Sequence, residues 1–516
     1  MNLAELVCRA AERAPARSAL VLADGTSRDW AETQDRISRR ASVLQDLGVG
    51  AGDRVALLAL NSEDYLETMY AALWAGAVIV PMNTRWSLAE NIYCLNDCRA
   101  KILVTSSACS GQADLLVAGS PSVVSHLQLQ GGQADEDFER LLARAEPAQL
   151  VDAAGCDLAG IFYTGGTTGF PKGVMLSHAS LLSSSISFWL TMPELPNDAR
   201  YLHVAPMFHL ADASQTIGVT LQAGTHLFVS AFDPLQIVDL LFAKQVTDLL
   251  LVPVMLDPIL DAAEGRPEVF ASLKRLIYGG SPISPGTLQR LIKAAPHLDL
   301  AQGYGQTEMA PTITVLTPAD HRRGTDDDNV RASAGRPAFG IDVRVVGEDF
   351  IPLPRGEVGQ VIARGANAML GYWERKDQTA DTLINGWVAT GDAGYFDSDG
   401  YLFLVDRYKD MIVTGGENVF SVEVERALGL HPMVRMAAVI GVPHDQWGEA
   451  VHAFVIPEAG TAPTADELIA HCKSLIAGYK APKSLEVVTD LPVSAAGKIQ
   501  KNQLRKTYAM PDRHMN

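Results

Sequence analysis

The sequence predicts an α/β fold of at least two domains, and three observations lead to this expectation. The chain has 516 residues, of which 47% are hydrophobic and 20% charged, so it can bury more than one ordinary hydrophobic core. Over its first two thirds, short β-branched runs alternate with helix-like stretches, which is typical of largely parallel sheets covered by helices. After about residue 335 the character changes to strand-like segments separated by Gly and Pro turns.

The predicted elements fall into a large N-terminal domain. Strand-like runs occupy residues 54–60, 101–105, 225–230 and 248–252, and helix-like stretches occupy residues 30–47 and 234–245. These runs predict two α/β subdomains. Further strand-like runs at residues 342–346, 359–363 and 401–405 predict a compact β-rich subdomain that follows them.

A domain joint is expected at Asp406-Arg407-Tyr408-Lys409. There a strand-like run ends in charged residues, shortly before the glycine pair Gly415-Gly416 and a new series of helices and strands. Residues 1–406 would then form the N-terminal domain, and residues 407–516 a small α+β C-terminal domain.

Composition excludes several classes of protein. The formal net charge of −18 at pH 7 argues against a nucleic-acid-binding surface, which needs concentrated Lys and Arg. The most apolar stretch, residues 70–82, falls short of the roughly 20 residues that span a bilayer. The N-terminus does not have the pattern of a secretory signal, and the 6 cysteines do not suggest a disulfide framework. We therefore expect a cytoplasmic protein without a transmembrane segment.

A glycine-rich loop is the strongest chemical signal. It follows an apolar strand-like run and precedes a stretch that reads as helical. Accessible backbone N–H groups, hydroxyl donors and one ammonium group suit a polyphosphate. The loop does not match the GxxxxGK[ST] pattern of a P-loop, and no GxGxxG sits at a strand-to-helix turn. The residues expected to contact the phosphates are Thr164, Gly165, Gly166, Thr167, Thr168, Gly169 and Lys172.

Together with other motifs, this loop resembles the adenylate-forming superfamily, which includes acyl-CoA synthetases, nonribosomal adenylation domains and beetle luciferases. The resemblance covers essentially the whole chain. The further motifs occur in the family's order and at similar spacings; they are Tyr304-Gly305-Gln306-Thr307-Glu308, Thr390-Gly391-Asp392, Asp406-Arg407-Tyr408-Lys409-Asp410, Gly415-Gly416-Glu417-Asn418 and Gly497-Lys498-Ile499.

The resemblance implies roles for the nucleotide-binding residues. Glu308 would hold Mg²⁺ on the phosphates of ATP, a task that suits a hard carboxylate ligand, and Thr307 would bond the α-phosphate. Tyr304 and the backbone around Gly280 would sandwich the adenine. Asp392 would accept hydrogen bonds from both ribose hydroxyls.

Three positively charged residues have implied roles near the domain joint and the end of the chain. Arg407 would lie near the ribose and the α-phosphate. Lys498 resembles the catalytic lysine that bridges the substrate carboxylate and the α-phosphate. Lys409 occupies the hinge position, where a mobile C-terminal domain would reorient between two half-reactions; an ordinary linker lysine is the alternative.

The resemblance also implies sites for the acyl group and for coenzyme A. His209 would border the acyl pocket and the pantetheine path, with a core histidine as the alternative. The acyl pocket would draw on residues 210–217, 278–282 and 309–313, which are mostly small or apolar. Asp212 would accept a bond from a substrate hydroxyl or face water. The residues expected to contact coenzyme A are Gly415, Gly416, Trp447, Tyr479 and Lys483.

The activity that this resemblance implies is that of an ATP-dependent acyl-CoA synthetase with Mg²⁺ as its cofactor. An aromatic, arylpropenoic or medium-to-long-chain fatty acid is favoured over a dicarboxylic acid. Loading of an acyl carrier protein in place of coenzyme A stays open, as does a homodimer. A binding protein without catalysis is disfavoured because Glu308 and Lys498 are both present.

Overall fold

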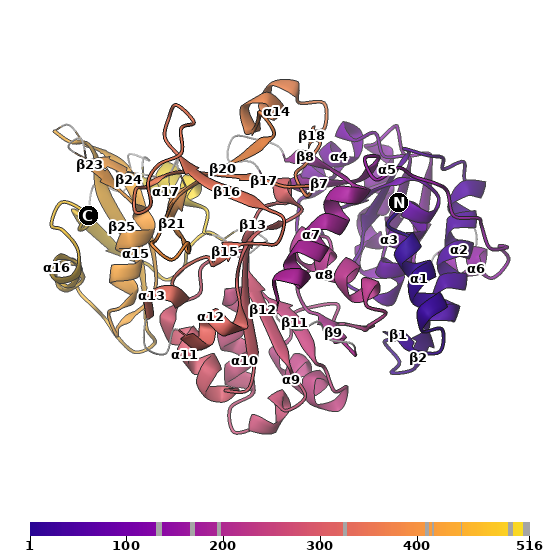
Figure 1. Ribbon diagram of the computed structural model, residues 1–516, viewed down its shortest axis with the longest axis horizontal. Helices are drawn as coiled ribbons and strands as arrows, with labels where there is room; N and C mark the ends of the chain where they lie inside the picture. The colour runs from indigo at the N-terminus through magenta and orange to yellow at the C-terminus, as the bar shows by residue number, and fades with distance from the viewer. Residues whose placement is uncertain are drawn as a thin grey trace. The chain divides into compact units, whose positions relative to one another are not determined.

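The computed structural model describes residues 1–130, 137–165, 171–192, 198–323, 328–407, 412–414, 417–444, 446–493 and 499–508. The chain divides into two compact units (Figure 1). The larger comprises Met1–Val343 and Ala363–Val388, and the smaller comprises Arg344–Ile362 and Ala389–Asn516. None of the described helices is long and apolar enough to cross a membrane.

The first sheet of the larger unit has seven strands in the order β18-β8-β7-β4-β3-β5-β6. Neighbours from β7 to β6 are parallel, whereas β8 pairs antiparallel with both β7 and β18. The strands are β3 (Arg54–Leu58), β4 (Val78–Pro81), β5 (Ile102–Thr105), β6 (Ser125–Gln128), β7 (Leu158–Thr164), β8 (Lys172–Ser177) and β18 (Gly371–Tyr372).

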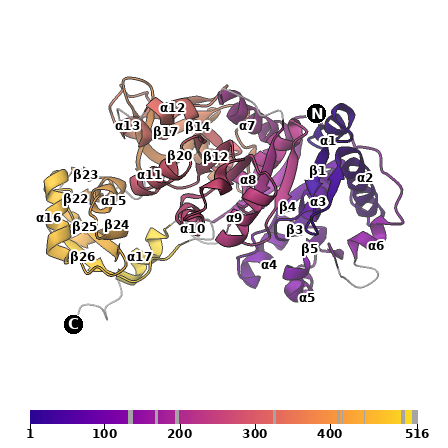
Figure 2. The ribbon, with the colours of Figure 1, turned by 90° about the horizontal axis from the view of Figure 1, so that it is seen from below.

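Helices cover both faces of this sheet, which explains its continuous apolar strands. Val55 and Leu57 of β3 pack in one core with α1 (Glu5–Arg13), α2 (Trp30–Asp46) and α3 (Glu63–Trp74). Ala56 and Leu58 point the other way and pack with α4 (Leu88–Asp97) and α5 (Ala113–Ala118). Figure 2 shows the two sets of helices on opposite sides of β3 to β5.

The second sheet of the larger unit has nine strands in the order β15-β14-β13-β12-β11-β9-β10-β1-β2. Strands β13 to β1 run parallel, so their carboxyl ends meet at one edge, the usual location of a ligand site in such sheets. The strands are β1 (Ser18–Val21), β2 (Ser27–Asp29), β9 (Arg200–His203), β10 (Thr225–Phe228), β11 (Asp248–Leu251), β12 (Arg275–Gly279), β13 (Asp299–Gly305), β14 (Thr312–Leu316) and β15 (Arg336–Pro337).

The helix α8 (Leu210–Leu221) lies in the middle of the larger unit and contacts α1 and α7 (His178–Thr191) as well as β10. This packing buries residues on every side of α8, including several polar ones.

The remaining helices of the larger unit are α6 (Phe138–Leu142), α9 (Pro234–Ala243), α10 (Leu256–Ala262), α11 (Pro285–Ala294), α12 (Pro318–Arg323), α13 (Asp328–Arg331) and α14 (Lys376–Thr382), with the short 3₁₀ turns η1 (Ser107–Gln112), η2 (Pro253–Met255), η3 (Pro267–Phe270) and η4 (Thr307–Met309).

Two smaller sheets complete the fold. One has the order β16-β17-β20-β19 with β21 paired to β20; its strands are β16 (Asp342–Val346), β17 (Gly359–Arg364), β19 (Leu383–Ile384), β20 (Trp387–Phe396) and β21 (Leu402–Arg407). The other has the order β23-β22-β25-β24 with β26 paired to β25; it comprises β22 (Ile412–Thr414), β23 (Glu417–Val419), β24 (Val434–His444), β25 (Gly448–Pro457) and β26 (Ser484–Val487), and is accompanied by α15 (Ser421–Gly429), α16 (Ala465–Leu475) and α17 (Lys501–Tyr508).

The predicted fold class is confirmed, because two helix-covered α/β sheets, a β-rich part and a small C-terminal α+β part are all present. One local expectation is wrong: the stretch after the glycine-rich loop is the strand β8, and the helix α7 begins only at His178. The boundary between residues 406 and 407 stays a prediction.

Candidate active site

The glycine-rich loop closes an antiparallel hairpin. Thr164, the last residue of β7, is the register partner of Lys172, the first residue of β8. The loop therefore connects two paired strands, and the element that follows it is the strand β8 and not a helix. Thr164, Gly165 and Lys172 are described, whereas the other predicted phosphate-contacting residues, Gly166, Thr167, Thr168 and Gly169, lie outside the described part of the chain.

Glu308 lies on the 3₁₀ turn η4, directly after the carboxyl end of β13. Backbone and side-chain contacts fix this turn: the Glu308 carbonyl accepts from the Met369 N–H at 2.9 Å, and the buried Asn367 amide donates to the Met309 carbonyl at 2.6 Å. The chain also needs Gly305 here, since a Cβ would lie 1.7 Å from the carbonyl oxygen of Pro311. The backbone position of Glu308 is thus set by the fold.

Tyr372 brings Lys172 and Glu308 together. Its phenol hydroxyl donates to Glu308 Oε1 at 2.7 Å. The Lys172 ammonium lies 5.2 Å from the centre of the Tyr372 ring, within the range of a cation–π interaction. Strand β18 carries Tyr372 to this place by pairing with β8, where Tyr372 is the register partner of Val174. Sequence reasoning missed Tyr372, because Gly371-Tyr372-Trp373 beside a charged run reads as an ordinary surface strand.

Further predicted residues lie at the carboxyl ends of neighbouring parallel strands. Tyr304 is near the end of β13, and Thr307 begins the turn η4 that follows. Gly280 directly follows β12, and its φ of +81° requires the conformational freedom of glycine. The adjacent strands β12 and β13 therefore bring Tyr304, Thr307, Glu308 and Gly280 to one edge of the sheet.

His209 is the N-cap residue of α8, and its carbonyl accepts from the backbone N–H groups of Asp212 and Ala213, each at 3.1 Å. Its ring lies 4.5 Å from that of Phe208. The half-buried His209 thus lies where β9 leads into α8, at the same edge of the sheet.

Asp212 is one of the buried polar residues of α8. It is fully buried, so the expectation that it faces water is wrong. Both carboxylate oxygens accept hydrogen bonds inside the protein, one from the Tyr201 hydroxyl at 3.0 Å and one from His203 Nδ1 at 2.6 Å. His203 Nε2 contacts His226 Nδ1 at 2.9 Å, and burial lowers the pKa of His226 well below its ordinary value. Asp212 therefore fixes α8 to the strands β9 and β10.

In the smaller unit, Asp392 is the register partner of Arg407 across the β20·β21 pair. The Asp392 N–H donates to the Thr390 hydroxyl oxygen at 3.1 Å, and that hydroxyl donates to the Val361 carbonyl at 2.7 Å. These contacts fix the backbone at Asp392 within the sheet.

Two of the residues predicted to contact coenzyme A lie together in the smaller unit. The Lys483 ammonium is 5.3 Å from the centre of the Trp447 ring, and His444, which sequence reasoning missed, stacks on Trp447 with ring centres 4.3 Å apart. Tyr479 is 42% exposed. Four further predicted site residues, Lys498, Lys409, Gly415 and Gly416, lie outside the described residues.

Tyr278, on the proposed acyl-pocket segment, is held by a buried histidine. The His321 Nδ1–H donates to the Thr317 carbonyl at 2.8 Å, so Nε2 accepts from the Tyr278 hydroxyl at 2.9 Å. Burial lowers the pKa of His321 to about 4. In the unfolded chain the imidazole has a pKa near 6.5 and binds a proton first as the pH falls.

This histidine should therefore cost stability in acid. Because the folded pKa is depressed, its contribution is fully present above about pH 6.5 and is lost as the pH falls from there toward about 4. Urea denaturation at pH 7.5 and at pH 5.5 measures the free energy of unfolding at each pH. Between these two pH values, we expect this free energy to fall by about 1 kcal/mol less in His321→Gln than in the parent protein. An unchanged pH dependence would contradict the assignment.

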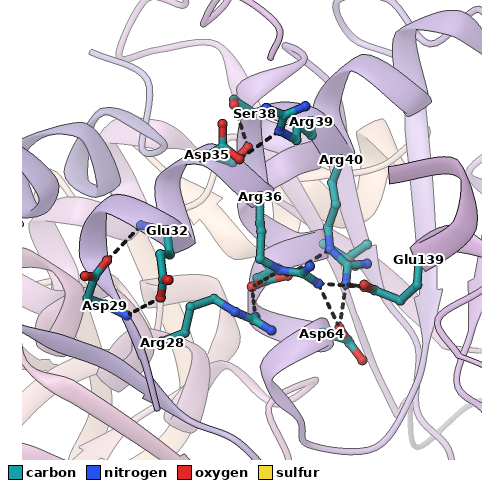
Figure 3. A network of polar contacts seen from close by, with 12 residues as sticks. Arg28, Asp29, Glu32, Asp35, Arg36, Ser38, Arg39, Arg40, Asp64 and Glu139 are labelled. Carbon is teal, nitrogen blue, oxygen red and sulfur yellow. Dashed lines mark hydrogen bonds and ion pairs between the residues drawn. The ribbon is translucent and has the colours of Figure 1, made fainter. Parts of the chain in front are cut away.

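A cluster of carboxylates elsewhere in the larger unit could be mistaken for a metal site. Oxygens of Asp64, Glu67 and Glu139 lie within 4.8 Å of one another. Figure 3 shows that the guanidinium groups of Arg36 and Arg40 lie among them. These cations already neutralise the carboxylates, so the cluster is an internal ion-pair network.

The family model described as AMP-binding enzyme matches residues 7–373, and the model described as AMP-binding enzyme C-terminal domain matches residues 423–498. The chain belongs to the AMP-binding enzyme family. The resemblance to adenylate-forming enzymes is thereby confirmed, and it covers both the hairpin loop and the Glu308 turn.

Relatives of this AMP-binding enzyme are similar over nearly their whole length. Feruloyl-CoA synthase from an Amycolatopsis species is 38% identical, covering 94% of each chain. The fatty acid–[acyl-carrier-protein] ligase ScoC from Streptomyces coeruleorubidus is 33% identical, covering 95% of this chain and 93% of its own. The crystal structure of ATP-bound MatB from Rhodopseudomonas palustris superposes with a TM-score of 0.88 at 31% identity, covering 98% of this chain and 99% of that one.

Proposed function

We propose that this AMP-binding enzyme is an ATP-dependent acyl-CoA synthetase, which converts a carboxylic acid, ATP and coenzyme A into acyl-CoA, AMP and pyrophosphate. The predicted enzyme class, an AMP-forming acid–thiol ligase, agrees with relatives that are named as CoA ligases. The observation that carries the proposal is the convergence of Lys172, Tyr372 and Glu308 beside the hairpin loop, in a chain whose family binds AMP.

In this proposal the loop and Lys172 hold the polyphosphate. Glu308 fits Mg²⁺, because its carboxylate is a hard oxygen ligand, Oε1 is oriented by Tyr372, and Oε2 has no partner within the described part of the chain. Bound there, Mg²⁺ would supply positive charge to the phosphates. Tyr304 and Gly280 would enclose the adenine, Thr307 would bond the α-phosphate, and Asp392 and Arg407 would contact the ribose.

Lys498 would complete the charge balance for the first half-reaction. The substrate carboxylate attacks the α-phosphorus of ATP and pyrophosphate leaves, giving an acyl-adenylate. This mixed anhydride is a better acyl donor than a carboxylate. In the second half-reaction the thiol of coenzyme A attacks the acyl carbon and AMP leaves.

The acid is proposed to be aromatic, arylpropenoic or a medium-to-long-chain fatty acid. Met309, Ala310 and Ile313 of the proposed pocket segments are apolar and buried, which suits such an acyl group. With Asp212 already bonded to Tyr201 and His203, we propose that it supports the pocket helix α8 and makes no contact with the substrate. The relative named feruloyl-CoA synthase supports an arylpropenoic acid.

Coenzyme A is the proposed acceptor. The group of Lys483, Trp447 and His444 offers an aromatic surface and a cation of the kind that suits the nucleotide end of coenzyme A. A carrier protein remains the second candidate, because ScoC is named as a ligase for an acyl carrier protein.

Three wider features are also proposals. A C-terminal domain of residues 407–516 would reorient at Lys409 between the half-reactions and bring Gly415 and Gly416 to the pantetheine path. A cytoplasmic location suits an enzyme that uses ATP and coenzyme A. A homodimer is a prediction that sedimentation velocity would test.

The deciding experiment measures pyrophosphate release and acyl-CoA formation with a panel of acids. Both should depend on added acid and Mg²⁺. The acyl group should pass to coenzyme A in preference to a carrier protein. Malonate should have a kcat/KM roughly 100-fold below that of the best aromatic or fatty acid, because an unpaired second carboxylate is costly to bury in an apolar pocket. Faster turnover of malonate would contradict the pocket assignment, and the absence of any acid dependence would contradict the function.

A further inference from the structure

Tyr372 stands between two groups of opposite charge that the proposed function uses. Lys172 lies over its ring, and Glu308 accepts a hydrogen bond from its hydroxyl. Lys172 and Glu308, which both belong to the described residues, do not form a direct ion pair with each other. The two charged residues are 136 positions apart in the sequence, and Tyr372 comes from a third segment. One buried phenol therefore connects the loop lysine to the candidate metal ligand.

The chemistry of the phenol suits this position. A phenol ordinarily has a pKa of about 10 and is protonated at neutral pH, so the Tyr372 hydroxyl can donate to the Glu308 carboxylate, as the 2.7 Å contact shows. A hydrogen bond to Oε1 fixes the orientation of the carboxylate and leaves Oε2 for another ligand. A neutral aromatic spacer also keeps the carboxylate from pairing with Lys172, a contact that would remove both charges from the phosphates.

Several contacts hold the segment that carries Tyr372. The Tyr372 N–H donates to the Thr379 hydroxyl at 2.9 Å, and the Trp373 N–H donates to the Gly173 carbonyl at 2.8 Å, one residue beyond Lys172. Strand β18 thus continues the sheet beside the hairpin, so that Tyr372 and Lys172 are carried by adjacent strands.

Asp97, at the end of α4, anchors the same segment to the other side of the hairpin. One carboxylate oxygen accepts from Arg375 at 2.7 Å, and the other accepts at 2.7 Å from the hydroxyl of Tyr163, which directly precedes Thr164. The Trp373 indole N–H donates to the Asp97 carbonyl at 2.9 Å. Asp97 thus connects the Tyr372 segment to β7, the first strand of the hairpin.

We propose that Tyr372 is a positioning residue that orients the Glu308 carboxylate for Mg²⁺ on ATP while keeping Lys172 separate from it. The inference rests on the proposed function, in which Glu308 serves the metal and Lys172 the phosphates. Tyr372 acts through these two residues and has no reacting atom of its own.

The test is Tyr372→Phe, which keeps the ring over Lys172 and removes only the hydroxyl. By isothermal titration calorimetry with ATP, the affinity in the presence of Mg²⁺ should fall about tenfold, as expected for the loss of one hydrogen bond to a charged group. The affinity for ATP in EDTA should stay within about twofold, because the Lys172 contact remains. Tyr395→Phe, in the smaller unit, is the matched control and should change neither affinity.

A double-mutant cycle separates a positioning role from general support of the fold. If the hydroxyl acts through Glu308, Tyr372→Phe should have no further effect on MgATP affinity in the Glu308→Gln background. Equal losses with and without Mg²⁺, an additive effect in the cycle, or no effect at all would each overturn the proposal. These measurements need no turnover, so they decide the role of Tyr372 even if the enzyme activates none of the acids tested.

Should Tyr372→Phe fold poorly by circular dichroism, the apparent KM for Mg²⁺ in pyrophosphate release decides the question on the folded fraction. The proposal expects this KM to rise about tenfold, with kcat at saturating Mg²⁺ falling less than threefold. A fall in kcat with an unchanged KM for Mg²⁺ would overturn it.

Discussion

Lys498→Ala should lower the rate of acyl-adenylate formation by roughly 10² to 10³, a loss of about 3 to 4 kcal/mol, comparable to removing a donor that stabilises a transition state. The physical reason is repulsion between anions. A carboxylate about 4 Å from a phosphate meets roughly 4 kcal/mol of repulsion per charge pair at an effective dielectric constant of about 20. A lysine that bridges the two groups offsets this cost in the first half-reaction.

The loss should be selective. Thioester formation from supplied acyl-adenylate and coenzyme A should stay near the parent rate, because the carboxylate and the phosphate no longer approach each other in that step. Single-turnover kinetics of each half-reaction measures the two rates separately. Lys506→Ala is a suitable control, since Lys506 is an exposed lysine on α17 and should leave both rates within about twofold.

Lys409→Pro should show the reverse pattern if Lys409 is the hinge. Proline fixes φ and so hinders a reorientation that passes through this residue. Adenylate formation should then persist while thioester formation falls. Equal losses in both steps for both variants would contradict the division of labour between Lys498 and Lys409.

Local patterns were enough to predict the main architecture. Strands such as β3 are apolar at consecutive positions because both faces are covered, and this makes them easy to recognise. The residues of the site follow the carboxyl ends of such strands, as Gly280 follows β12 and Glu308 follows β13. Motif order therefore predicted both the fold class and the family.

Contacts between distant segments were not visible in the sequence. Tyr372 reaches Glu308 only because the two-residue strand β18 adds to the edge of a sheet, and a strand this short carries no periodic pattern. One of the two expectations for Asp212 was that it faces water, as most aspartates do. Its burial depends on Tyr201 and His203, which come from another element and supply its hydrogen bonds.

The burial of the arginines of α2 could not be predicted from the sequence either. Arg36 and Arg40 are spaced as on a solvated helix face, yet Arg40 is fully buried against Glu67 and Asp64 of α3. Only the packing of α2 on α3 brings these charges together. Sequence spacing alone could not distinguish an exposed charged face from this buried network.

Glu67→Gln should destabilise the larger unit by about 3 to 5 kcal/mol, the usual cost of removing one partner from a buried ion pair. Glu67 is fully buried, and Arg40 Nε and Arg36 Nε donate to its oxygens at 2.9 and 3.1 Å. Arg28 forms a third ion pair with it. Burial by itself would raise the pKa of Glu67, but the charges of Arg40, Arg36 and Arg28 hold it below its ordinary value.

The amide of glutamine has nearly the shape of the carboxylate, so the substitution tests charge more than volume. It leaves three guanidinium groups facing one fewer negative charge, and the buried Arg40 cannot lose its proton to compensate. Urea denaturation followed by circular dichroism measures the change. Asp198→Asn is the matched control, because its pair with Lys274 is exposed and should contribute little. If both variants unfold at the same urea concentration, the Glu67 network contributes no more than a surface ion pair.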